Sequence, residues 1–287
     1  MTEGGAGEEL PAGTRLGRVA LTVGSLSDVL PFYRDVLGFT VSRDGARATL
    51  SAGDRPCLVL VEDAGAPARA SDAAGLFHVA VRVPDRAALA DVLARVEASD
   101  AALTGASDHL VSEALYLRDP EGNGVEVYRD RPRAEWPRDE DGSPDIGTLP
   151  FDRSGLASAT TGRRALPVGT DVGHVHLEVT DLERATAFYV GALGFRIQER
   201  IDGGVFVAAD GYHHHVALNT WQSRRAPADP AARGLRWFEI MLPDETSRTV
   251  VSERVENAGY EVRETERDAV EAVDPDGMWV RFVTERR

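Results

Sequence analysis

The sequence lacks lysine and has a single cysteine. All 32 of its basic side chains are arginine, and 47 acidic residues outnumber them, which gives a net charge of −15. Proteins that bind duplex nucleic acid neutralise phosphates with clustered cations, so this balance excludes nucleic acid as the expected partner. Cys57 has no second cysteine for a disulfide and no companion thiol for a thiolate metal site. We expect it to be a small apolar side chain in the core.

Long hydrophobic runs are missing too. No stretch reaches the roughly eighteen apolar residues that indicate a membrane-spanning helix. The N-terminal sequence MTEGGAGEELPAGTR has neither the basic start nor the apolar segment of an export signal. These features predict a cytoplasmic protein with no membrane partner. The length of 287 residues and the 43% hydrophobic content suit two globular domains, preceded by a disordered N-terminus over residues 1–14.

Two pairs of internal repeats organise the chain. Residues 19–41, VALTVGSLSDVLPFYRDVLGFTV, alternate like a strand, continue with helical spacing and end in a further strand, and residues 175–197 repeat this arrangement. Residues 76–96 parallel residues 235–255, and an Asp-Pro-x-Gly turn follows each of them. The chain therefore consists of four strand-helix-strand-strand-strand modules, over residues 16–62, 76–130, 172–222 and 234–285.

Four such modules resemble the vicinal-oxygen-chelate superfamily, which includes glyoxalase I, extradiol dioxygenases and bleomycin-binding proteins. The resemblance implies an α+β fold in which four βαβββ modules form two open mixed-sheet barrels. We expect one domain over residues 15–130, a second over residues 172–287, and a linker over residues 131–171, which are rich in Pro, Gly, Ser and charge. Gly38 and Gly194 end the first helix of each domain, where a left-handed C-cap favours glycine.

In this superfamily, metal ligands project inward from the first and last strands of paired modules. The aligned first-strand positions are Arg18, His78, His174 and Trp237, and the aligned last-strand positions of modules two and four are Glu126 and Arg281. Only modules two and three supply metal-binding side chains, namely His78, Glu126 and His174. Two imidazoles and one carboxylate hold Fe(II) on one face and leave the other positions open. His176 lies two residues from His174 on the same strand face and is the alternative ligand.

Two further segments resemble extradiol dioxygenases. ALYLRDPEGNGVEVY, which contains Glu126, resembles the metal-binding end of those enzymes, and the resemblance implies that Tyr116 and His109 contact the substrate. GYHHHVALNTW resembles the strand that carries their acid-base histidine, which here is His214. Strand parity favours His215 instead, so both assignments stay open at this point.

The whole chain most closely resembles bacterial catechol-2,3-dioxygenases, so we expect an enzyme that cleaves a small aromatic diol with O2 at Fe(II), with Mn(II) as the alternative metal. A homo-oligomer is compatible with the sequence. The alternatives are a glyoxalase-like isomerase or lyase, and a ligand-binding protein without catalysis. A metal site built from Glu239, His176 and His215 is a further possibility.

Contiguous pairing of the modules would separate His78 and Glu126 from His174. We therefore predict that module two pairs with module three, and module one with module four. In that arrangement His78 and His174 lie close together, and Arg18, Trp237 and Arg281 share the other barrel.

Overall fold

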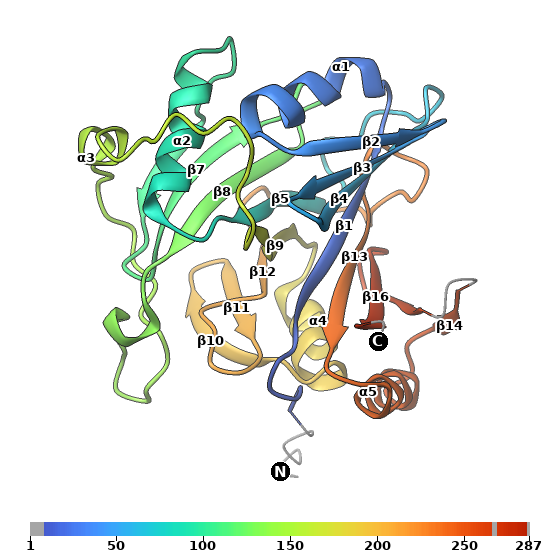
Figure 1. Ribbon diagram of the computed structural model, residues 1–287. Helices are drawn as coiled ribbons and strands as arrows, with labels where there is room; N and C mark the ends of the chain where they lie inside the picture. Colours follow the sequence, from blue (N-terminus) through green and yellow to red (C-terminus); the bar gives the residue numbers. More distant parts are fainter. Residues whose placement is uncertain (1–8, 266–268, 286–287) are drawn as a thin grey trace.

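The computed structural model describes residues 9–265 and 269–285 and contains two eight-stranded mixed sheets (Figure 1). The first sheet has the strand order β14 (Val262–Glu264), β15 (Val270–Val273), β16 (Trp279–Thr284), β13 (Gly234–Leu242), β1 (Arg15–Val23), β4 (Arg55–Glu62), β3 (Arg47–Ala52) and β2 (Thr40–Asp44). The second sheet has the order β10 (Arg196–Ile201), β11 (Gly204–Ala208), β12 (Val216–Asn219), β9 (Asp171–Glu178), β5 (Gly75–Arg82), β8 (Gly124–Asp130), β7 (Ser112–Arg118) and β6 (Gly105–Asp108).

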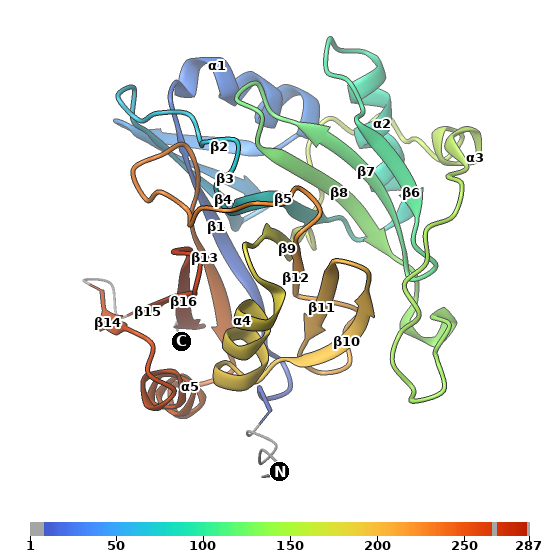
Figure 2. The same ribbon diagram turned by 180° about the vertical axis from the view of Figure 1, so that it is seen from behind.

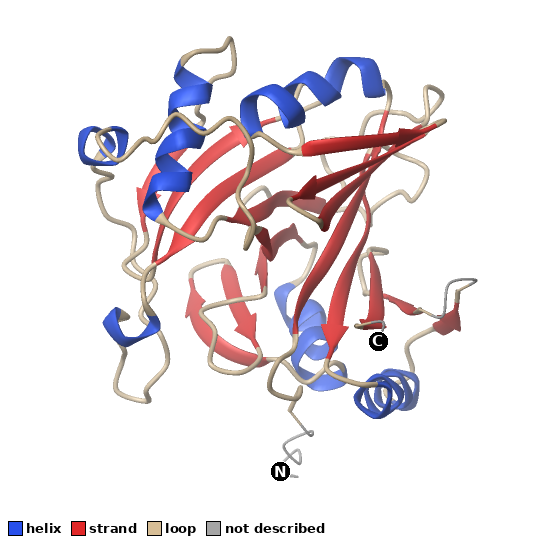
Figure 3. Cartoon of the chain, viewed as in Figure 1, coloured by secondary structure: helices blue, strands red, loops and turns tan. Residues whose placement is uncertain are grey.

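The helices lie around the outside of the two sheets (Figure 3). They are α1 (Leu26–Pro31), which continues as the π-helical segment η1 (Phe32–Leu37), α2 (Arg86–Glu97), the short η2 (Arg133–Glu135), α3 (Arg153–Ala157), α4 (Leu182–Thr186) with its continuation η3 (Ala187–Ala192), and α5 (Glu245–Asn257). Gly38 and Gly194 follow the first helix of each half with φ angles of 92° and 89°, as their sequence context predicts. Within the described ranges, no helix is long and apolar enough to cross a membrane.

The modules pair across the chain. β1 of module one runs antiparallel to β13 of module four, and β5 of module two runs antiparallel to β9 of module three. This confirms the predicted pairing and the expected α+β architecture of two mixed sheets. The helices are grouped by the halves of the chain and not by the sheets: α1 and α2 lie at one end of the molecule, and α4 and α5 at the other (Figures 1 and 2). Each contiguous half of the chain therefore contributes strands to both sheets.

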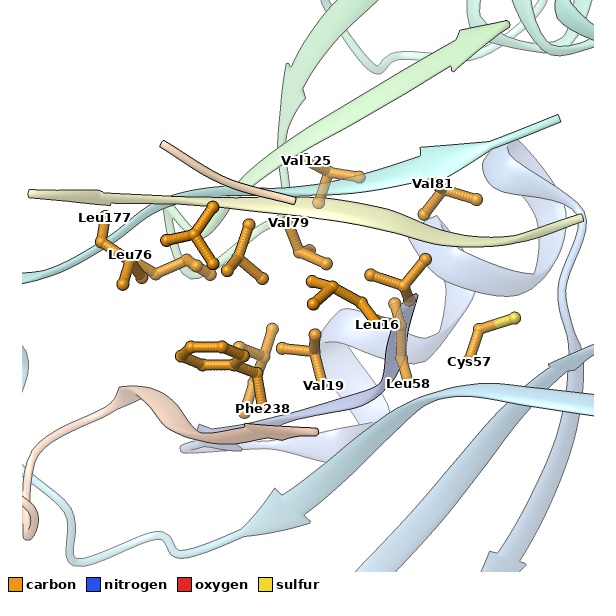
Figure 4. Packing of buried hydrophobic residues seen from close by; sticks show 14 of the residues in the cluster. Leu16, Val19, Cys57, Leu58, Leu76, Val79, Val81, Val125, Leu177 and Phe238 are labelled. Carbon is orange, nitrogen blue, oxygen red and sulfur yellow. The ribbon is translucent and has the colours of Figure 1, made fainter. Parts of the chain in front are cut away.

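One hydrophobic core joins the backs of the two sheets. Figure 4 shows Val19 and Phe238 of the first sheet pointing toward Val79 and Leu177 of the second, and all four are fully buried. Cys57 is part of this cluster and only 1% exposed, which confirms its expected role as a core side chain. Because the backs supply the core, the opposite face of each sheet is free to build a site.

Matching hydrogen bonds join the modules within each half. The hydroxyl of Tyr33 in η1 donates to Asp119 Oδ2 at 3.0 Å, and the hydroxyl of Tyr189 in η3 donates to Asp274 Oδ2 at 3.0 Å. The two aspartates belong to the repeated Asp-Pro-x-Gly turns. These turns therefore connect a helix of one module to the strands of the next.

One expectation needs correction, and the structure adds detail to a second. The expected disorder of residues 1–14 does not hold for Leu10, which is buried and donates its N–H to Gly194 O at 2.9 Å, while residues 1–8 lie outside the described part of the chain. The segment 131–171 does connect the second module to the third, but it is packed against the molecule. Trp136 and Leu156 are buried, because a long segment that carries large apolar side chains gains free energy by covering the sheets.

Candidate metal centre

Strands β5 and β9 place histidines side by side on the concave face of the second sheet. His78 lies opposite His176 in the register, and Ala80 lies opposite His174. Side chains alternate between the two faces of a strand, so Val175 and Leu177 enter the core while His174 and His176 point to the other face. The full burial of β9 shows that both faces are covered.

The structure brings the three sequence-predicted ligands into one cluster. Glu126 on β8 is the register partner of Ala80, next to both histidine positions. Its Oε2 lies 2.9 Å from His78 Nε2 and 3.2 Å from His174 Nε2. One ligand atom from each residue lies within 4.8 Å of the others, and all three residues are buried.

Burial and mutual contact set the charges of this cluster. Burial alone would raise the pKa of Glu126, but His174 and His78 hold that pKa well below its usual value. Burial lowers the pKa of His174 to about 4, although Glu126 acts in the opposite direction. The cluster therefore combines a carboxylate with a neutral imidazole, and a metal ligand must be deprotonated in just this way.

The donor atoms fit a divalent cation. Among the described residues, the buried Nε2 of His78 has no hydrogen-bond partner, although it lies within contact distance of Glu126. The imidazole of His78 is not oriented for a hydrogen bond to the carboxylate of Glu126. A buried polar atom without a partner lowers the stability of the fold. A cation placed between the imidazoles and the carboxylate would satisfy all of them.

The alternative ligands are not members of this cluster, although the ring of His176 lies 4.9 Å from that of His78 and lines the same pocket. His176 is not part of the cluster; its ring packs edge-on against Phe77 and Trp221, with centroids 5.0 and 5.1 Å away. Glu239 belongs to β13 of the other sheet, where its carboxylate accepts hydrogen bonds from the backbone and guanidinium N–H groups of Arg18. A site built from Glu239, His176 and His215 is therefore contradicted by the structure.

A pocket of about 510 Å³ opens above the cluster. Five of the six candidate residues line it, and His174 lies deeper, at 2% exposure. The apolar lining includes Phe77, Phe206 and Trp221. A mostly apolar cavity with a few converging polar groups is the usual form of a small-molecule site.

His109 and Tyr116 form a hydrogen-bonded pair in the pocket wall. His109 Nδ1 lies 2.8 Å from Gly147 O, so this nitrogen must carry a proton and donate it to the carbonyl. His109 Nε2 is then the acceptor for the Tyr116 hydroxyl at 2.7 Å. The hydroxyl oxygen of Tyr116 keeps its lone pairs for a bound molecule.

The three consecutive histidines precede their strand, because β12 begins only at Val216. Strand parity therefore does not govern them. His214 lines the pocket, and its ring centroid lies 4.1 Å from that of His174. His215 packs against Phe195 instead, and its Nδ1 accepts the backbone N–H of Ala209 at 3.2 Å.

Several pocket residues were not found from the sequence. Ile146, Gly147 and Thr148 come from the segment expected to be a linker, and no local motif indicates that they reach the pocket. Glu199 on β10 also lines the pocket, and within the described ranges its buried Oε2 has no hydrogen-bond partner. Burial, reinforced by the charge of Asp145, raises the pKa of Glu199 to about 7.

The corresponding face of the first sheet also lines a cleft, of about 1970 Å³, but ion pairs occupy the positions equivalent to the metal cluster. Arg281 stacks over the ring of Trp237 at 4.1 Å and contacts Glu271 at 2.7 Å, while Arg18 contacts Glu239 at 2.5 Å. Arg18, Trp237 and Arg281 thus share the other barrel, as predicted. Guanidinium groups cannot coordinate a metal, so these positions offer no ligand. Among the described residues, the one His/Glu cluster is in the second sheet.

Crossed βαβββ modules and a buried His-Glu-His cluster define a class of metal-binding protein, and comparison with known proteins agrees. The profile of the Glyoxalase/Bleomycin resistance protein/Dioxygenase superfamily matches residues 15–127 and 171–282, and the chain belongs to this superfamily. A catechol-2,3-dioxygenase of Bacillus subtilis (strain 168) is 43% identical over 281 residues, which cover 94% of this chain and 97% of that protein.

Solved structures show the same fold at low sequence identity. A protein from Bacillus subtilis subsp. subtilis str. 168 gives a TM-score of 0.68 at 14% identity, covering 98% of this chain and 87% of that one. Glyoxalase I from Zea mays gives a TM-score of 0.57 at 17% identity, covering 95% and 92% of the two chains. Because these identities are low, the two structures support the fold alone.

Proposed function

We propose that this chain is an extradiol ring-cleaving dioxygenase, which opens a catechol-like ring with O2 at a metal held by His78, Glu126 and His174. The observation that carries the proposal is the buried cluster of two imidazoles and one carboxylate beneath a 510 Å³ pocket. The relative at 43% identity, a catechol-2,3-dioxygenase, supports the same substrate class. The cytoplasmic location and the homo-oligomer stay predictions.

Fe(II) is the proposed metal. Two histidines and one carboxylate bound on one face are the ligand set of non-haem Fe(II) oxygenases, and Mn(II) is the alternative. When bound, such an ion supplies adjacent coordination sites for a diol and for O2. The protein supplies the ligands, the orientation of the substrate and a site with little water.

The pocket residues have separate roles in this proposal. The ring of a catechol packs among Phe77, Phe206 and Trp221. One hydroxyl group of the diol donates to the oxygen of Tyr116, whose own proton is held by His109. His214 lines the pocket and accepts a proton from the diol. Burial and the neighbouring histidines lower its pKa well below the usual value, which keeps the imidazole unprotonated before the diol binds.

The test combines metal analysis with oxygen uptake. Protein purified without oxygen should contain about one Fe(II) or Mn(II) per chain, and reconstitution with each metal in turn should show which one supports O2 consumption with catechol. Glu126→Gln should bind the metal tens-fold or more weakly, because a neutral amide replaces the only anionic ligand. Glu239→Gln is the matched control, since it changes a buried carboxylate of the other sheet, and it should leave the metal content unchanged.

The same measurements separate the rival functions. A glyoxalase-like isomerase or lyase would bind metal but consume no O2, and a ligand-binding protein would show no turnover. Metal retained in Glu126→Gln and lost in Glu239→Gln would contradict the ligand assignment.

A further inference from the structure

A buried hydrogen-bonded chain lies behind His214. The Nδ1 atoms of His214 and His213 are 2.8 Å apart, and His213 Nε2 lies 2.9 Å from Asp130 Oδ1. The other carboxylate oxygen of Asp130 accepts from Arg82 at 3.2 Å and from the Tyr212 hydroxyl at 3.0 Å. The side chains of His213 and His214 are buried, and Asp130 is the last residue of β8, the strand that carries Glu126.

The direction of each hydrogen bond in this chain follows from its carboxylate end. An ionised carboxylate can only accept, so His213 Nε2 must donate its proton to Asp130. A neutral His213 then has an unprotonated Nδ1, which can only accept. With His213 neutral, the proton between the two Nδ1 atoms belongs to His214.

We infer that Asp130 and His213 are positioning residues that fix His214 in the Nδ1–H tautomer, with the unprotonated Nε2 facing the pocket. The inference rests on the proposed function, and it explains how His214 is prepared to accept a proton from a diol. When Nε2 takes that proton, Nδ1–H continues to donate to His213, and the carboxylate of Asp130 lies at the end of the chain as the counter-charge. The ring orientation of His214 is fixed by the same bonds.

Asp130→Asn should reverse the direction of the hydrogen bonds that join residue 130, His213 and His214. Arg82 and Tyr212 both donate to the same oxygen of Asp130, so the amide oxygen of asparagine would occupy that position and its NH2 group would face His213. His213 Nε2 would then accept a hydrogen bond, and its Nδ1 would carry the proton. His214 would be left with a protonated Nε2, which cannot act as a base. The shape of the side chain is nearly unchanged, so the substitution mainly alters the tautomer.

The experiment is nitrogen NMR of the full-length protein with 15N-labelled histidine, with and without diamagnetic Zn(II), together with steady-state kinetics. In the wild type, His214 should carry its proton on Nδ1, with signals assigned by their loss in His214→Gln. In Asp130→Asn the proton should move to Nε2. With catechol, kcat should fall by about 10²-fold or more, the range of a lost acid-base group, at unchanged metal content and with a much smaller change in KM.

Asp171→Asn is the matched control. Asp171 accepts from the same Arg82 guanidinium at 2.7 and 3.0 Å, and no hydrogen bond links it to the histidine chain in the described structure. This variant should retain both the His214 tautomer and kcat. A wild-type His214 protonated on Nε2 would overturn the inference, as would a loss of kcat in Asp130→Asn without a change of tautomer. A change of tautomer in a protein without oxygen uptake would refute the proposed function and leave the tautomer assignment standing.

Discussion

The buried carboxyl of Asp274 makes the stability of this protein depend on pH in an unusual direction. Asp274 is 4% exposed and accepts hydrogen bonds from the backbone N–H groups of Asp276 and Met278 and from the Tyr189 hydroxyl. Burial is the main cause that raises its pKa from the ordinary 3.8 to about 7, and the backbone N–H of Met278 acts in the opposite direction. The folded protein therefore keeps this group protonated over a range in which the unfolded chain has released the proton.

The sign and the size of the effect follow from linkage. Below pH 3.8 the carboxyl is protonated in both states and costs nothing. Between pH 3.8 and 7 the folded state binds more protons than the unfolded state, so the contribution of Asp274 to the free energy of unfolding falls as the pH rises. A shift of about three pKa units at about 1.36 kcal/mol each gives a loss of about 4 kcal/mol, which is complete above pH 7.

Asp274→Asn removes this titration and keeps nearly the same shape. Urea unfolding followed by circular dichroism at pH 4.5, 6 and 8.5 should show the free energy of unfolding of the variant rising by about 3 kcal/mol relative to the wild type across this range. Asp152→Asn is the control, and its free energy of unfolding relative to the wild type should change with pH in the opposite direction. The reason is that hydrogen bonds from Gly155 and Ser154 lower the pKa of that exposed carboxyl. A constant difference between Asp274→Asn and the wild type would refute the reasoning.

Three predictions concern the pocket. His214→Ala should keep the metal and lower kcat by about 10² to 10⁴-fold, whereas His215→Ala should lower the free energy of unfolding and spare the chemistry; the reverse pattern in metal analysis and kinetics would refute the assignment. Tyr116→Phe should lower kcat/KM about fivefold, because it removes the oxygen that accepts a hydrogen bond from the diol and one net hydrogen bond is worth about 1 kcal/mol; an unchanged kcat/KM would exclude this contact with the substrate. The KM for a carboxylated catechol should rise as the pH passes 7, where Glu199 ionises, and Glu199→Gln should abolish this rise; the same pH dependence in both proteins would place Glu199 outside the binding site.

The sequence contained enough information for the architecture and for the three clustered residues. The repeats gave equivalent strand positions, and because only two modules carry metal-binding side chains, the pairing of His78 with His174 followed by elimination. The inward direction of Glu126 was implied by the resemblance to the superfamily, in which the first and last strands of paired modules carry the metal ligands.

Other features depend on contacts that no local pattern encodes. Strand parity favoured His215 over His214, but parity does not apply to either residue because β12 begins after them, at Val216. Gly147 and Trp136 lie in a segment whose composition is that of a linker, and their packing is decided by the sheets beneath. The roles of Asp130 and His213 depend on hydrogen-bond partners far apart in the sequence, which only the folded chain brings together.

The nested order of the modules has a consequence for synthesis on the ribosome. The sheet that carries the metal centre uses only the two inner modules, so all its strands exist once Asn219 has been added. β1 is made first, yet its antiparallel partner β13 ends at Leu242 and the last strand of that sheet ends at Thr284. Until β13 has been made, one edge of β1 has unpaired backbone groups. Unpaired strand edges allow strands of different chains to associate. The first and last modules thus make the nascent chain most vulnerable to aggregation, while the metal centre can form early.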